Sequence, residues 1–293
     1  MTARTFFLLI GTSLALAACS GSATNTETPP PPPPPTQHLY VGDDQTTGAL
    51  RSYALPIAAS STPAASVGMN SPFTIGLNST TLAVADLNSN LYWFTLPLTS
   101  TSTPYAMIAA GSDGTPIFTP AGTLYQGGIG KINVYTPPFT SSSTPSSSIT
   151  TTGLSPDDMA IDPNGNVYET TGGNTIGVVT GGVLTTTLTA PVGTQFRGLA
   201  ATSSQLFACE FVSQGSRNIY VYSLPLTASA TPAVIINLGS YSPEGCAVDA
   251  DGNLYMGSSD GTVLEFKPPF TSASVPAVTL TTPAVIFGIA IGK

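Results

Sequence analysis

The alternation of apolar and polar positions predicts β-strands along most of the chain. Between residues 242 and 269, three short apolar runs (246–248, 254–256 and 263–266) are divided by two segments that each contain Asp-Gly. A period of two is typical of a half-buried strand, and Asp-Gly favours a tight hairpin turn. This segment is therefore predicted to form a three-stranded antiparallel meander.

The meander recurs together with a second pattern, which we call the proline phrase. It consists of an aromatic residue, Leu-Pro or Pro-Pro, an apolar residue, and a Ser/Thr-rich loop with proline. The copies begin at Tyr53, Phe94, Tyr135, Tyr222 and Phe266, at steps of 41, 41, 87 and 44 residues. A period of about 40–45 residues with four strands per unit is typical of β-propeller blades.

One unit and the two ends of the chain depart from this pattern. The 87-residue step contains a degenerate unit around residues 158–191. This unit keeps the meander but has residues 183–189 in place of the proline phrase. The piece that starts at Leu39 lacks a first strand, and residues 285–293 are a first strand with nothing after it. Placed together, the two ends complete a sixth blade and leave no long free sheet edge. We therefore predict an all-β, six-bladed propeller of four-stranded antiparallel blades over residues 37–293.

The first 18 residues have the pattern of a targeting segment. Arg4 is their only charge, and their apolar run is too short to span a bilayer. The run ends in Leu16-Ala17-Ala18-Cys19, which resembles a bacterial lipobox and implies cleavage before Cys19 and its acylation, for example with palmitate. We expect residues 1–18 to be a lipoprotein signal peptide and Cys19 to anchor the protein to a lipid bilayer. A plain secretory signal is the alternative.

Residues 19–36 are interpreted as a tether between the anchor and the propeller. Seven consecutive prolines at positions 29–35 favour an extended polyproline II rod. At ~3.1 Å per residue, this rod spans roughly 20 Å. The expected location is the bacterial cell envelope outside the cytoplasm, at the outer membrane or the cell surface.

The charge of the chain narrows the classes of partner. Charged residues make up 8% of the chain, against ~25% in a typical soluble protein. Without residues 1–18, six basic and fifteen acidic side chains remain, with a net charge of −9. This balance argues against nucleic acid as a partner. The single histidine, His38, lies at the tether junction, which argues against a histidine-based zinc site or a Ser-His-Asp triad inside the fold.

The most regular units resemble known propeller repeats. The phrases GCAVDADGNLY at residues 245–255 and MAIDPNGNVY at residues 159–168 resemble NHL repeats and blades of the gluconolactonase (senescence-marker-protein) family. The similarity covers nearly all of residues 37–293, in positions that shape the blades. In the gluconolactonase family a channel metal is held by a Glu at the start of an inner strand and by Asn and Asp from others. The resemblance implies that role for Glu244, while the pattern does not place the Asn and Asp partners.

Aligning the blades predicts which residues surround one mouth of the central channel. The starts of the first strands supply three apolar residues followed by three charged ones. In ring order these are Phe287, Phe73, Ile117, Asp157, Arg197 and Glu244. The ends of the second strands, which reach the same mouth, add three carboxylates. These are Asp43, Asp86 and Glu210.

This set of residues allows a functional and a structural interpretation. It can form a pocket for a ligand with one apolar and one polar side, or hold Ca²⁺ or another divalent cation on Glu244, Asp43, Asp86 and Glu210. Alternatively, Arg197 bridges Asp157 and Glu244 as a structural ion network, and Asp43 and Asp86 cap turns.

Two smaller features also leave alternatives open. The loops at residues 162–166 and 249–253 resemble the first half of a calcium-binding loop, but a hairpin turn explains both more simply. Cys209 and Cys246 are expected on adjacent blades, where they either form a disulfide or remain two buried thiols.

The absence of a recognisable catalytic set favours a binding or scaffold module. We expect a monomeric propeller that is not an enzyme and binds a protein, peptide or glycan partner of the cell envelope. The alternative is a metal-dependent, lactonase-like hydrolase with a divalent cation in the channel and Glu244 as a ligand. A third interpretation is one subunit of a larger envelope complex.

Overall fold

The computed structural model describes residues 36–43, 47–112, 114–151, 158–170, 172–211 and 217–293. The chain divides into two units, residues 1–34 and 35–293, and all described residues belong to the second. The predicted signal peptide, the anchor residue Cys19 and most of the tether lie outside the described residues. All regular secondary-structure elements in the described part are strands. The described residues therefore include no helix long and apolar enough to cross a membrane.

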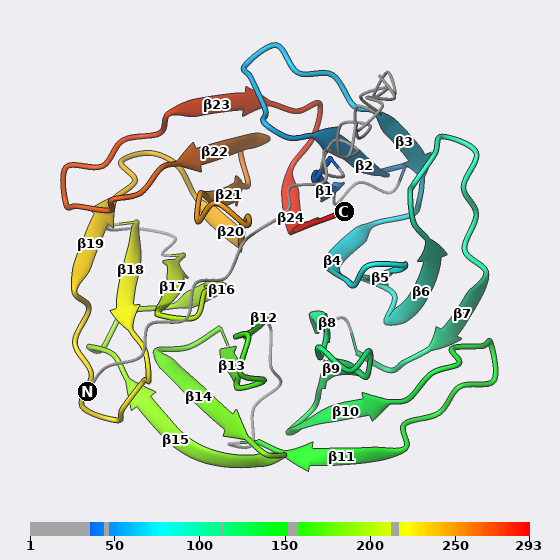
Figure 1. The fold of residues 1–293 in the computed structure, drawn as a ribbon, viewed down its shortest axis with the longest axis horizontal. Helices are drawn as coiled ribbons and strands as arrows, with labels where there is room; N and C mark the ends of the chain where they lie inside the picture. Colours follow the sequence, from blue (N-terminus) through cyan, green and yellow to red (C-terminus); the bar gives the residue numbers. More distant parts are fainter. Residues whose placement is uncertain (1–35, 44–46, 113, 152–157, 171, 212–216) are drawn as a thin grey trace, which may run out of the picture. The chain divides into compact units, whose positions relative to one another are not determined.

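Six four-stranded antiparallel sheets surround a central axis and confirm the predicted six-bladed propeller (Figure 1). The innermost strands of blades 1 to 6 are β24 (Ile286–Gly292), β4 (Pro72–Leu77), β8 (Pro116–Phe118), β12 (Asp158–Ile161), β16 (Phe196–Ala201) and β20 (Pro243–Val248). The second strands are β1 (His38–Asp43), β5 (Thr81–Asp86), β9 (Leu124–Gly128), β13 (Val167–Thr170), β17 (Gln205–Glu210) and β21 (Leu254–Ser258).

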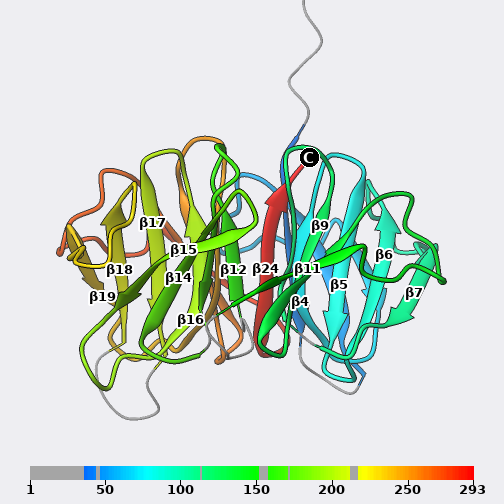
Figure 2. The ribbon, with the colours of Figure 1, turned by 90° about the horizontal axis from the view of Figure 1, so that it is seen from below.

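The outer half of each blade is formed by two further strands. The third strands are β2 (Ala49–Ala54), β6 (Asn90–Thr95), β10 (Lys131–Tyr135), β14 (Thr175–Thr180), β18 (Asn218–Ser223) and β22 (Thr262–Phe266). The fourth strands are β3 (Ala65–Gly68), β7 (Ala106–Ala109), β11 (Ser147–Thr150), β15 (Val183–Thr189), β19 (Val234–Asn237) and β23 (Val278–Thr281). In the side view, β7 and β19 lie at the outer edges, with β24 and β12 near the middle (Figure 2).

The two ends of the propeller sequence close the ring, as predicted. β24 pairs with β1 in antiparallel register, from His38 opposite Gly292 to Gly42 opposite Gly288. The last strand of the chain thus becomes the innermost strand of the first blade (Figure 1). This pairing supplies the hydrogen bonds that the edge of β1 would otherwise lack.

The hydrophobic core consists of six clusters, each between two neighbouring blades. The apolar residue of each proline phrase packs into the cluster between its own blade and the preceding one. These residues are Ile57, Leu98, Phe139, Leu226 and Phe270. In one of these contacts the ring of Phe139 stacks on Trp93, with centroids 5.4 Å apart and planes 6° apart. The proline phrases therefore help to seal the gaps between blades.

Blade 4 follows the predicted departure from the repeat. Residues 183–189, which replace the proline phrase, form the fourth strand β15 directly. A two-residue Gly181-Gly182 turn, with φ of +60° and +81°, joins it to β14. Glycine is the residue that adopts this conformation without steric cost. The cluster between blades 3 and 4 consequently contains no residue of a proline phrase.

The two loops that resemble calcium-binding loops are hairpin turns. In the first, the Asp162 carboxylate accepts hydrogen bonds from the backbone N–H groups of Asn164 and Asn166, the Asn166 amide and the Tyr168 hydroxyl. Asp249 has the equivalent four partners in blade 6. Because each carboxylate is engaged in holding its own turn, the hairpin interpretation is the one that the structure supports.

Candidate functional site

Of the six first-strand residues predicted at the channel mouth, five line one cavity of about 250 Å³. They are Phe73, Ile117, Arg197, Glu244 and Phe287. The cavity lies where the innermost strands begin, the lower end of β24 in Figure 2. The sixth predicted residue, Asp157, lies outside the described residues, and the adjacent Asp158 lines the cavity.

The apolar wall of the cavity is centred on two aromatic rings from neighbouring blades. The rings of Phe73 and Phe287 have centroids 5.0 Å apart and an interplanar angle of 39°. Gly288 makes this proximity possible, because a Cβ at that position would lie 2.5 Å from the carbonyl oxygen of Phe73. Without a side chain there, β24 and β4 approach closely and bring the two rings together.

The polar wall is formed by an ion pair between blades 5 and 6. Nη1 of Arg197 lies 3.3 Å from Oε2 of Glu244, and the guanidinium also lies over the ring of Phe211, 4.7 Å from its centroid. The Glu244 side chain is buried, whereas 37% of the Arg197 side chain is exposed. The predicted bridge between Arg197 and Glu244 is therefore present, and the Arg197 side chain, which lines the cavity, remains partly exposed.

Asp158 connects three blades at the same mouth. Its Oδ1 accepts a hydrogen bond from the Thr115 hydroxyl on blade 3 at 2.6 Å, and its Oδ2 accepts one from the Leu199 N–H on blade 5, also at 2.6 Å. Sequence reasoning selected Asp157 and missed this residue. Alignment with blade 6 could have identified Asp158, because it aligns with Gly245. At Gly245 the neighbouring blade approaches closely, so a side chain at the aligned position in blade 4 is near its neighbours.

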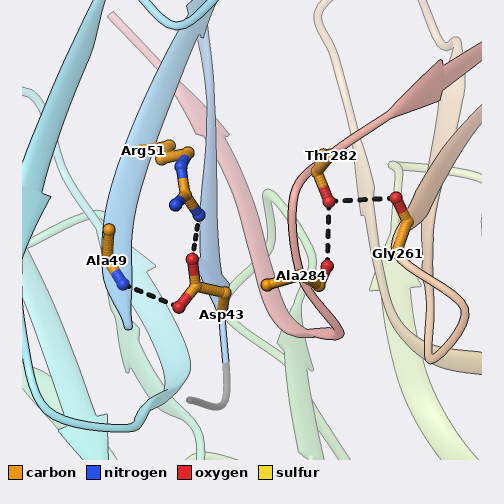
Figure 3. A network of polar contacts seen from close by, with 6 residues as sticks. All are labelled: Asp43, Ala49, Arg51, Gly261, Thr282 and Ala284. Carbon is orange, nitrogen blue, oxygen red and sulfur yellow. Dashed lines mark hydrogen bonds and ion pairs between the residues drawn. The ribbon is translucent and has the colours of Figure 1, made fainter. Parts of the chain in front are cut away.

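Asp43, one of the predicted metal ligands, is bound within its own blade. Its carboxylate accepts a hydrogen bond from the Ala49 N–H at 2.7 Å and forms an ion pair with Arg51 (Figure 3). On the neighbouring blade, the Thr282 hydroxyl donates to the carbonyl oxygens of Gly261 and Ala284, which fixes the segment that leads into β24.

Asp86 and Glu210 are also turned toward the third strands of their blades. The Asp86 carboxylate accepts from Asn90 and from the Tyr92 hydroxyl on β6. The Glu210 carboxylate accepts from the Asn218 amide at 2.6 Å and lies 3.3 Å from the Tyr220 hydroxyl, both on β18. Burial raises the pKa of Glu210, and these two hydrogen bonds partly offset the shift.

The structure therefore does not gather the four predicted metal ligands. Among the described residues, no group of three or more His, Cys, Asp or Glu side chains could hold a metal ion. Of the four, only Glu244 lines the cavity. The physical reason is that the carboxylates at the second-strand ends find donors on the third strand, away from the axis. The capping interpretation of Asp86 is the one that the structure shows.

Cys209 and Cys246 lie next to each other between blades 5 and 6 as buried free thiols. Of the two alternatives left open by the sequence, the structure shows the second. Burial raises the pKa of Cys246 well above its usual range, and the neighbouring Cys209 raises it further. Cys246 also lines the cavity, which the sequence did not predict.

Comparison with known proteins supports the propeller fold. A model of the strictosidine synthase-like N-terminal family matches residues 232–266, which span β19 to β22. No curated protein matches the chain. The closeness to NHL repeats and to the gluconolactonase family remains a prediction.

Solved structures similar to this chain share its fold at low sequence identity. A chain of "COPII on membranes, outer coat vertex" is 17% identical with a TM-score of 0.56, over 83% of this chain and 76% of that one. A chain of "Crystal Structure of Mitotic Checkpoint Complex" is 17% identical with a TM-score of 0.58, over 80% and 74%. A chain of "The structure of the COPII coat assembled on membranes" gives 17% and 0.56, over 83% and 42%. At this identity the likeness concerns the fold alone.

Proposed function

We propose that this protein is an extracytoplasmic binding propeller, anchored to a membrane through acylated Cys19, that receives a group of its partner in the mouth cavity. The observation that carries the proposal is the composition of this cavity. The rings of Phe73 and Phe287 form one wall, and the Arg197–Glu244 pair forms another. Concave sites that combine apolar side chains with a few fixed polar groups are typical of ligand binding.

The path of β1 places the mouth at the end of the ring opposite to His38. β1 begins at His38 and ends at Asp43, which pairs with Ile286 at the start of β24. The neighbouring Phe287 lines the mouth, so His38 lies at the opposite end of the ring.

Photo-crosslinking in the intact envelope tests this function. The full-length protein carries a benzophenone amino acid either in place of Phe73 at the mouth or in place of Thr101, an exposed loop residue at the other end of the ring. We expect a defined adduct from position 73 that weakens when Arg197→Ala is added, and no such adduct from position 101. Equal labelling at both positions, or none at position 73, would refute a binding site at the mouth.

One observation favours a second candidate, a metal-dependent lactonase-like hydrolase. Glu244 lines the cavity, which is where the resemblance to the gluconolactonase family implies a metal ligand. Metal analysis of the purified protein separates the two candidates. One tightly held divalent ion per chain, lost in Glu244→Gln together with hydrolysis of a simple lactone, would favour the enzyme. A metal-free protein without lactone hydrolysis would remove it.

A further inference from the structure

The mouth cavity continues along the ring axis into an apolar passage. A second cavity of about 190 Å³ is lined by residues from all six innermost strands. All of its described lining residues are apolar, glycine or cysteine, and none carries a charged or hydroxyl side chain. It shares five lining residues with the mouth cavity, which places the two one above the other. These are Ile75, Ile117, Leu199, Cys246 and Ile289.

The passage reaches the other end of the ring. A third cavity, about 530 Å³, shares Leu77, Phe118, Ile161 and Ala201 with the apolar passage. Polar side chains reappear there, among them Asn78 and Asp162. Along the ring axis, polar side chains therefore occur at both ends, and only apolar side chains, glycine and cysteine occur between them.

An unbranched alkyl chain is the occupant that suits the apolar passage. The side chains of the passage offer no hydrogen-bond partner, and the polar groups that border it are backbone groups of the innermost strands, each of which is the edge strand of its sheet. Methylene groups of a ligand can pack against the apolar side chains between these backbone groups. An unfilled passage also leaves its lining side chains without dispersion contacts on one side. A narrow tube formed by six strands admits a single chain more readily than a branched or planar group.

The charges at the mouth limit the head group of such a ligand. Arg197 is already paired with Glu244. Asp158 is a second carboxylate among the described residues that line the mouth cavity. An anionic head group would meet net negative charge, and a cationic one would compete with Arg197 for Glu244. Hydroxyl groups can donate to the carboxylates and accept from the exposed part of Arg197.

We propose that the mouth and the passage together bind a single-chain amphiphile with an uncharged, polyhydroxyl head group, as in a monoacylglycerol or an alkyl glycoside. The alkyl chain lies along the axis between Ile75 and Ile161, and the head group lies between Phe287 and Arg197. This inference rests on the proposed function, because it takes the mouth cavity to be the binding site and specifies the ligand.

Calorimetry with a homologous series tests the alkyl site. The protein is the mature chain from residue 19 with Cys19→Ser, which needs no competing detergent, and the probes are n-alkyl β-glucosides of six to ten carbons below their micelle concentrations. We expect the affinity to rise about fourfold per added methylene until the passage is full, while glucose alone binds much more weakly. An affinity that does not change with chain length would overturn the proposal.

Variants locate the site and separate chain from head group. Ala201→Leu narrows the passage, so the rise in affinity should stop at a shorter chain, whereas Ala64→Leu at an exposed position should change nothing. Unchanged circular dichroism and melting temperature confirm that both variants fold. Arg197→Ala should weaken every glucoside by a similar factor and leave the increment per methylene unchanged. Identical series for Ala201→Leu and Ala64→Leu would contradict binding in the passage.

Two further probes keep this inference distinct from the proposed function. Octanoate and octylamine are compared with octyl glucoside, and tighter binding of either charged probe would overturn the uncharged head group. If no alkyl probe binds while crosslinking at position 73 persists, the amphiphile is wrong and the binding propeller stands. If the methylene increment is found but crosslinking fails, the alkyl site stands and the envelope partner is wrong.

Discussion

The two sides of the ring hold their innermost strands together in different ways. From blade 5 through blade 6 to blade 1, Gly198, Gly245 and Gly288 allow direct backbone approach to the next blade. Around blade 4, Asp158 instead bridges to Thr115 and Leu199 with its carboxylate. On the glycine side the innermost backbones approach each other directly, whereas on the blade 4 side a carboxylate links the innermost strands. The charge at the mouth is thus partly a consequence of how this side is closed.

The same contrast extends into the gaps between blades. Four blades have a buried apolar residue at the second-strand position that pairs with Ile75 or its equivalent in the first strand. These residues are Val41, Val84, Ala208 and Met256. In blade 4 this position is Glu169, which is 1% exposed and has no hydrogen-bond partner among the described residues for either carboxylate oxygen. Its blade also lacks a proline phrase. Blade 4 is therefore where we expect the stability of the fold to depend most strongly on pH.

The largest expected effect is a pH dependence caused by Glu169. Burial raises the pKa of its carboxyl to about 7, so the folded state binds more protons than the unfolded state between about pH 4.5 and 7. The free energy of unfolding should therefore fall by about 3 kcal/mol as the pH rises through this window. Glu169→Gln should remove this part of the pH dependence in urea titrations. Parallel pH profiles of the two proteins would show that the carboxyl is ionised in the folded state.

The second effect concerns the glycine side of the ring. In Gly288→Ala, the new Cβ would lie 2.5 Å from the backbone carbonyl oxygen of Phe73. This backbone atom cannot move aside as the end of a flexible side chain could. We expect a loss of about 2 to 3 kcal/mol in the free energy of unfolding. Gly68→Ala is the matched control, because a Cβ there meets nothing within 4 Å. Equal small losses for the two substitutions would mean that close approach does not hold this side.

Asp158→Ala tests the carboxylate bridge on the other side. The Thr115 hydroxyl and the Leu199 N–H lose a charged acceptor, and we expect a cost of about 2 kcal/mol. Asp158→Asn should recover part of this loss, because the amide oxygen still accepts one hydrogen bond. If denaturant unfolding is unchanged in Asp158→Ala, the bridge is not what closes blades 3 to 5.

The smallest effect should appear in acid. Burial alone would raise the pKa of Asp162, but its hydrogen bonds to Asn166, Tyr168 and Asn164 hold it below the usual value. The turn therefore contributes stability above the unfolded-state pKa, and this is lost as the pH falls through the lower folded pKa. Asp162→Asn should make the protein less sensitive to acid than the wild type, measured by melting between pH 5 and pH 2. The exposed Asp251→Asn should leave the profile unchanged.

The fold could be predicted because the same strand and turn pattern recurs several times along the chain. The proline phrases give the period, and the incomplete units at Leu39 and at residues 285–293 give the closure. Glu244 and Arg197 could be placed at the mouth because first-strand starts share one height in every blade. The repeat thus fixes which residues occur at the mouth.

Side-chain direction and the passage could not be read in this way. The ends of second strands give a position for Asp86 but not the donors on β6 toward which its carboxylate turns. The passage stayed hidden because residues such as Ile75 and Leu199 have the pattern of ordinary core residues. Only the six strands together show that part of their surface borders an axial cavity.

A crystal structure of the mature chain grown with octyl glucoside would decide whether the ring axis is a binding site. We expect the glucose ring between Phe287 and Arg197, and the alkyl chain in the passage toward Ile161, with the Arg197–Glu244 pair intact. Electron density for the glucoside only on the outer surface, or an Arg197 side chain that fills the mouth while the passage holds ordered water, would contradict ligand binding on the axis.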